Sequence, residues 1–130
     1  MTIRYTRSLD DVDWTVLASV FERASLGTPQ VAMLEQSYRN SALHIFSYDS
    51  NELIGAARAI SDGVYHAALC DTVVLPEYQG KGIGRHMVET LLHDMQGLKV
   101  ILTASFGKEG FYKKLGFQRH KTALAYGYGP

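Results

Sequence analysis

The sequence is poor in cysteine, in net charge and in long apolar runs. Cys70 is the only cysteine among 130 residues, so the chain can form no internal disulfide and offers no cysteine cluster for zinc. Lysine and arginine together number 13, as do aspartate and glutamate, and this balance does not indicate a nucleic-acid partner. A membrane-spanning helix needs about 18 apolar residues in a row, and no such run occurs. We therefore expect no bound metal, no nucleic acid, no membrane association and a cytoplasmic location.

Apolar residues are plentiful enough for a folded core. They make up 46% of the chain, and a length of 130 residues is typical of one domain, so we expect a single domain over residues 1–130. Cys70 lies in the apolar stretch 67–75, and these surroundings predict a buried thiol.

The spacing of apolar residues predicts an α/β (α+β) fold, because strand-like segments alternate with segments of helical period. The expected strands cover residues 1–6, 43–48, 53–60, 64–75 and 99–105, with two more between residues 117 and 128. The expected helices begin at Asp10 or Asp11, at residue 28, at Gly84 and at Lys108. Short connections indicate an antiparallel meander, and the helix between the strands 64–75 and 99–105 makes that pair parallel. The prediction is a mixed, mainly antiparallel sheet of about seven strands flanked by about four helices.

A glycine-rich loop, QGKGIG, lies where the long strand 64–75 gives way to a helix. Gly80, Gly82 and Gly84 lack Cβ atoms, so a ligand can press against the main chain. The first amides of a helix have no internal partner and carry the positive end of its dipole, and Lys81 and Arg85 add positive charge. Such a site binds phosphates. No Lys-Ser or Lys-Thr pair follows the glycines, and the dinucleotide fingerprint would place its last glycine on Arg85 or Met87. Both of those nucleotide motifs therefore fail. The remaining alternative is a turn that only connects strand to helix.

Two motifs resemble one known family. Residues 79–84 match the Q/R-x-x-G-x-G/A signature of the GNAT superfamily of acyl-CoA-dependent N-acyltransferases, and GFYKKLGF at 110–117 is similar to the family's FYxKLGF segment. They occur in the family's order, separated by a helix and a strand, and the expected element order fits along nearly the whole chain. The resemblance implies that acetyl-CoA or a related acyl-CoA is the donor. It also implies a bulged strand, splayed from its parallel neighbour to form a thioester slot between residues 71–75 and 102–105.

The resemblance further implies which residues hold the donor. The loop would wrap the pyrophosphate, Arg85 would lie beside it, and the strand carrying Val73 and Val74 would bond the pantetheine arm through its backbone. The residues that this assigns to the donor are Val73, Val74, Gln79, Gly80, Lys81, Gly82, Ile83, Gly84 and Arg85.

Acyl transfer to an amine requires a neutral amine, a donor for the oxyanion and a proton for the leaving thiolate. Tyr112 stands at the tyrosine of the FYxKLGF segment, which commonly serves as general acid, and its alternative is a packed aromatic. A backbone N–H at the bulge, near Val73, is the expected oxyanion donor. Asp71 is a candidate base, but it equally suits a structural pair with an arginine such as Arg58. His66 or a chain of waters is a further candidate base.

The sequence therefore predicts an acetyl-CoA-dependent N-acetyltransferase in which a primary amine attacks directly, through a tetrahedral intermediate. The acceptor is open, with a small-molecule amine favoured over a protein amine because the chain is small and carries no net charge. A sensor module that binds acyl-CoA without turnover is the alternative. The tyrosines near the C-terminus are compatible with an acceptor pocket or with a homodimer contact.

Overall fold

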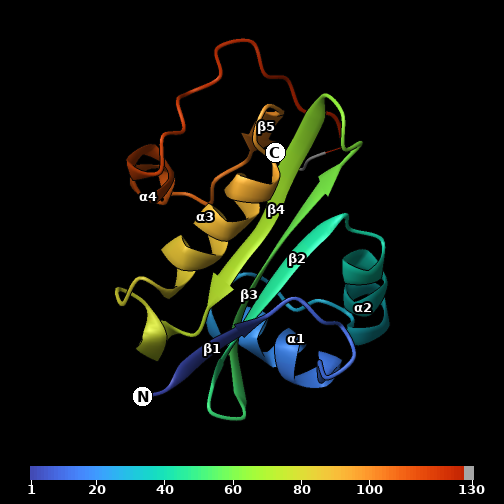
Figure 1. The fold of residues 1–130 in the computed structure, drawn as a ribbon, viewed down its shortest axis with the longest axis vertical. Coiled ribbons are helices and arrows are strands. Elements are labelled where there is room, and N and C mark those ends of the chain that lie inside the picture. Colours follow the sequence, from blue (N-terminus) through green and yellow to red (C-terminus); the bar gives the residue numbers. More distant parts are fainter. Residues whose placement is uncertain (128–130) are drawn as a thin grey trace.

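The computed structural model describes residues 1–127 (Figure 1). The elements run in the order β1 (Ile3–Thr6), α1 (Trp14–Arg23), α2 (Val31–Arg39), β2 (Leu43–Asp49), β3 (Glu52–Ser61), β4 (His66–Val74), a 3₁₀ turn (Pro76–Tyr78), α3 (Ile83–Asp94), β5 (Lys99–Leu102) and α4 (Glu109–Lys114). No helix in the described part of the chain is long and apolar enough to cross a membrane.

The strands form one mixed sheet in the order β1-β2-β3-β4-β5. Neighbouring strands are antiparallel except β4 and β5, which are parallel and are connected in the chain through α3. The predicted meander and the predicted parallel pair are therefore confirmed.

The predicted count of about seven strands is wrong, because no strand forms over residues 118–127. A strand needs a hydrogen-bonded neighbour and a face to pack against. Leu124 and Tyr126 find no such face, since they are 99% and 100% exposed. Figure 1 shows this segment as a long irregular path after α4. Tyr128, at the end of the predicted strands, lies outside the described residues.

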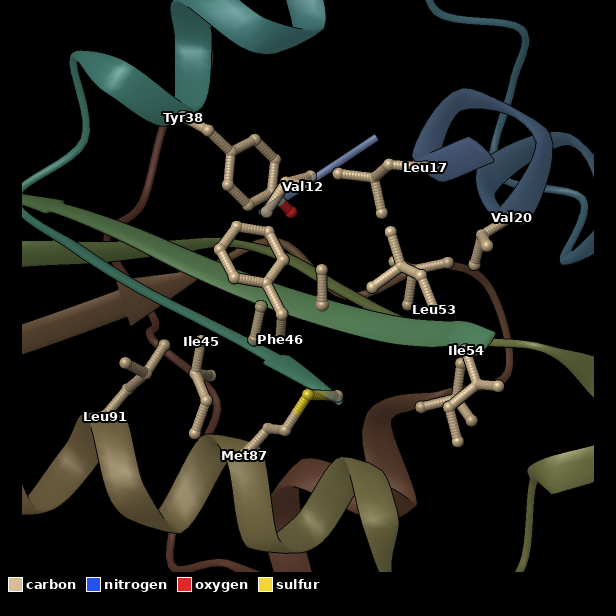
Figure 2. Packing of buried hydrophobic residues seen from close by; sticks show 14 of the residues in the cluster. Val12, Leu17, Val20, Tyr38, Ile45, Phe46, Leu53, Ile54, Met87 and Leu91 are labelled. Atoms are coloured by element: carbon tan, nitrogen blue, oxygen red, sulfur yellow. The ribbon is translucent and has the colours of Figure 1, made fainter. Parts of the chain in front are cut away.

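Helices cover both faces of the sheet. Figure 2 shows that Phe46 and Ile45, neighbours on β2, point to opposite faces. Phe46 lies against Tyr38 of α2, with ring centroids 5.5 Å apart, whereas Ile45 points toward Leu91 and Met87 of α3. All five side chains are at least 98% buried. Alternation along β2 thus supplies one apolar surface to α1 and α2 and another to α3.

The first helix begins later than predicted. Asp13 caps α1, because its Oδ1 accepts hydrogen bonds from the main-chain N–H groups of Thr15 and Val16. Asp10 and Asp11, the predicted caps, lie in the preceding turn. All three aspartates suit the role chemically, and the one that lies next to the buried Trp14 is used.

Candidate functional site

Strands β4 and β5 pair over only part of their length. The pairing joins residues 66–69 with residues 99–102 and then stops. β4 continues to Val74, whereas β5 ends at Leu102. Residues 70–74 of β4 therefore have no strand partner among the described residues on the edge of β4 that is nearer to β5. The strands part at the predicted position of the slot.

A bulge at Cys70 decides which groups of β4 face the slot. Arg58 pairs with Asp71 and Ala59 with Leu69, so Cys70 is the extra residue. The predicted buried thiol is wrong, because Cys70 is exposed on this bulge.

The register beyond the bulge assigns the main-chain groups. The N–H of Leu75 donates to the carbonyl of Ile54 on β3 at 2.9 Å. Because main-chain groups alternate along an antiparallel strand, those of Val73 also point to β3, whereas those of Thr72 and Val74 point to the slot. The bulge therefore lies three residues before Val73, and Thr72 is the residue whose amide faces the opening.

The glycine loop presents free amides at the start of α3. Gly80 and Gly82 have φ of 78° and 83°, in the left-handed region that favours glycine, and Gly82 is the N-cap. No side chain caps the helix and its first turn has no acidic residue. None of the N–H groups of residues 80–85 donates to another described residue. These amides and the helix dipole suit an anionic ligand.

Cationic side chains flank these amides. Arg85 pairs with Glu89 one turn along α3 at 3.1 Å, and both side chains are more than half exposed. Lys81 is exposed and takes part in no ion pair within residues 1–127. Both cations are therefore near the loop and accessible, although neither is held toward it.

Hydrogen bonds fix the loop to the sheet. The side-chain amide of Gln79 donates to the carbonyl of Val74 at 2.9 Å, and the Gln79 N–H donates to Pro76. Gln79 therefore holds the loop against the end of β4, with its own N–H already used. The hydroxyl of Tyr78 donates to Asp49 at 2.6 Å and to Glu52 at 3.2 Å. Both bonds raise the pKa of Tyr78, that to Asp49 more than that to Glu52, and the bond from Tyr78 lowers the pKa of Asp49.

Asp71 lies on the other face of the sheet, in an ion pair. Its Oδ2 accepts from Nε of Arg58, and the two side chains are only 18% and 19% exposed. Arg58 also donates to Ser41 and lies over the ring of Tyr38. Burial, and then the nearby Asp71 carboxylate, raise the pKa of Tyr38. The structural alternative for Asp71, a pair with Arg58, is thus present in the structure.

Tyr112 lines a cavity of about 950 Å³ beside β5. It is half-buried between Phe111 and Phe117, with ring centroids 4.9 and 5.9 Å away. The cavity lies between β5, α4 and residues 117–126, and no described residue of β4 or of the glycine loop lines it. Leu102, at the end of β5, lines the cavity and also lies beside the slot. Phe111, the neighbour of Tyr112 on α4, lies at the slot itself, because its Cζ and the Cγ2 atoms of Thr72 and Val74 are all within 3.8 Å of the position that a Cβ of Gly84 would take.

The structure brings all nine predicted donor residues to one end of the sheet. Residues 73, 74 and 79–85 follow one another around the end of β4 and the start of α3. His66 is not near them, because it opposes Lys99 at the other end of β4. Sequence reasoning missed Thr72 and Tyr78. No sequence pattern marks the position of a bulge, so Thr72 had no signal, whereas Tyr78 directly precedes the QGKGIG loop.

Comparisons with known proteins agree with this geometry. The sequence model described as "Acetyltransferase (GNAT) family" matches residues 8–117. "Serotonin N-acetyltransferase 2, chloroplastic" of Oryza sativa subsp. japonica is 32% identical over 91% of this chain and 62% of its own length. A histone acetyltransferase of Glycine max is 35% identical over 67% of this chain and 42% of its own length. The chain therefore spans about half the length of these relatives.

A solved structure shares the fold. A probable acetyltransferase from meticillin-resistant Staphylococcus aureus superposes with a TM-score of 0.86 at 22% identity, covering 99% of both chains. The family match, the relatives, the parted β4 and β5 and the glycine loop at α3 lead to one conclusion. The chain belongs to the GNAT family of acetyltransferases.

Proposed function

We propose that the chain transfers an acetyl group from acetyl-CoA to a primary amine. The observation that carries the proposal is the run of free amides at residues 80–85 beside an unpaired length of β4. The amides suit the diphosphate of the donor. The open edge suits its pantetheine arm, which pairs with the main chain as an added strand does. Thr72 and the N–H of Val74 supply that edge, since the Val74 carbonyl already accepts from Gln79.

The residues around the slot have separate roles in this proposal. The amine attacks the thioester carbonyl directly, and the Thr72 N–H donates to the oxygen that becomes negative. Tyr112, next to Phe111 on α4, protonates the leaving thiolate. Asp71, held by Arg58, lies where the amine enters, on the face opposite the glycine loop. A water chain then takes the proton of the amine.

We propose a small-molecule amine as the acceptor. The names of the relatives cite different acceptors, serotonin in one and histone in another, so family membership alone leaves the acceptor open. The balanced charge of 13 basic and 13 acidic residues favours neither a strongly acidic nor a strongly basic macromolecule.

The test is an acceptor screen with acetyl-CoA and a panel of small amines, amino-terminal peptides and lysine peptides. Free CoA and acetylated product are quantified by chromatography, because the exposed Cys70 would react with thiol dyes. Product with at least one amine is expected. Tight acetyl-CoA binding with no product from any amine would instead favour the acyl-CoA sensor. No binding at all would refute both functions.

A further inference from the structure

The two faces of the sheet serve different ligands. Thr72 Cγ2 and Val74 Cγ2 lie 3.8 and 3.6 Å from the position that a Cβ of Gly84 would take, so both side chains are on the α3 face with the loop. Asp71 and its partner Arg58 are on the face of α1 and α2, beside Tyr38. A donor that enters from the loop leaves the Asp71 face free for the acceptor.

The Asp71 face changes abruptly from covered to bare. On the glycine-loop side of Asp71, Val73 of β4 and Ala56 of β3 are fully buried, and α1 packs on these two strands. Beyond it, Ile60 of β3 is 47% exposed and Ile101 of β5 is 54% exposed. The register pairs each of them with Ala68, so the three side chains share this face. With the exposed Cys70 they form the apolar strip, defined as Ile60, Ala68, Cys70 and Ile101.

Charge differs between the two ends of the apolar strip. At the slot end, Arg58 donates to Asp71 Oδ2 and the buried Tyr38 hydroxyl lies beside the same carboxylate, whereas Oδ1 accepts no hydrogen bond of normal length from the described residues. At the far end, Lys99 and His66 oppose each other and share the face of the strip. A ligand with one amine fits this polarity, whereas a second ammonium would lie beside Lys99. Arg58 offsets part of the attraction by which Asp71 would hold the incoming amine in its charged form.

The strip is short. Ala68 precedes Asp71 by three residues, one of which is the bulge, and a strand rises about 3.3 Å per residue, so the strip extends about 7–10 Å from Asp71. That length suits one aromatic ring or a fused pair of rings. Ile101 also lines the cavity that holds Tyr112, which makes the strip continuous with the proposed general acid.

We propose that the acceptor is a primary monoamine with a flat apolar body, which lies on the apolar strip with its nitrogen at Asp71 Oδ1. This proposal rests on the proposed function. It excludes polyamines, which would carry positive charge toward Lys99, and peptides, whose backbone would need polar partners that the strip lacks.

The first experiment compares phenethylamine, spermidine and a lysine peptide as acceptors at saturating acetyl-CoA. We expect kcat/KM for phenethylamine to exceed that for spermidine by about tenfold or more. Ile60→Thr and Ile101→Thr are each expected to raise KM for phenethylamine about five- to tenfold while leaving acetyl-CoA affinity unchanged. Val16→Thr, at a 39% exposed apolar residue of α1, is the matched control. Ile101→Asp is expected to shift preference toward spermidine.

The second experiment detects binding without turnover. Cys70 is the only thiol and lies within the strip, so bound phenethylamine is expected to slow its reaction with a disulfide reagent, whereas spermidine leaves the rate unchanged. Better turnover of spermidine or of the peptide, or no protection of Cys70, would overturn the acceptor assignment while acetyl transfer stands. Failure to turn over any amine would overturn the proposed function itself.

Discussion

Two variants of Gly82, Gly82→Asp and Gly82→Asn, differ from each other by one charge at the N-terminus of α3 and by little else. Gly82 has φ of 83°, and a Cβ built there meets nothing within 4 Å. Asn and Asp tolerate this left-handed conformation better than other side chains and differ only in charge. Both variants are therefore expected to fold with similar stability, so their difference in CoA affinity isolates electrostatics.

The size of that difference follows from Coulomb's law. A carboxylate about 6 Å from each of two phosphate charges in water costs about 0.7 kcal/mol per pair, or about 1.4 kcal/mol in total. Gly82→Asp is thus expected to bind CoA at least about tenfold more weakly than Gly82→Asn. Isothermal titration calorimetry at 0.05 M and 0.5 M salt measures the ratio, which salt should shrink. Equal affinities of the two variants at low salt would refute the placement of a diphosphate at this loop.

The remaining predictions concern three other residues. Tyr112→Phe is expected to lower kcat about 100-fold with CoA affinity unchanged, and equal kcat would clear Tyr112 of the acid role. Arg58→Met leaves the partly buried Asp71 unpaired and is expected to lower the free energy of unfolding by about 1–3 kcal/mol in urea titrations, whereas adding Asp71→Leu should restore most of it. Tyr78→Phe removes the bond to Asp49. That bond lowers the pKa of Asp49 below its ordinary 3.8 and raises that of Tyr78 above its ordinary 10.0. The stabilisation is therefore present between about pH 4 and 10 and is lost beyond both limits. The difference in melting temperature from wild type should be largest at neutral pH and shrink in acid, and a difference that persists unchanged in acid would contradict the assignment.

Most of the fold could be predicted from local patterns in the sequence. The alternation of apolar residues located β2, β3 and β4, and the return of a helical period located α3 directly behind the glycine loop. These features are local, because each depends on side chains a few residues apart. The loop amides were predictable for the same reason, since the glycines and the helix start are adjacent in the chain.

The resemblance implied a bulge in this strand, but the exact register of the pairing was not predictable. The position of the bulge, at Cys70, is a property of the register between β3 and β4, and the residue type at that position does not predict it. The exposure of Cys70 and the orientation of Thr72 both follow from that bulge. Likewise, residues 118–127 contain strand-forming side chains such as Tyr126 but have no paired neighbour, which composition cannot reveal.

The central claim is that main-chain amides between residues 80 and 85 bind the diphosphate of CoA. The most direct measurement is a titration of ¹⁵N-labelled protein with CoA and, separately, with pantetheine, which lacks the diphosphate, followed by amide NMR. CoA is expected to shift the amide signals of Gly80, Gly82 and Gly84 saturably, whereas pantetheine should leave them unmoved and affect Thr72 and Val74 alone. Unshifted signals of all three glycines at saturating CoA, in a well-folded sample, would contradict the account.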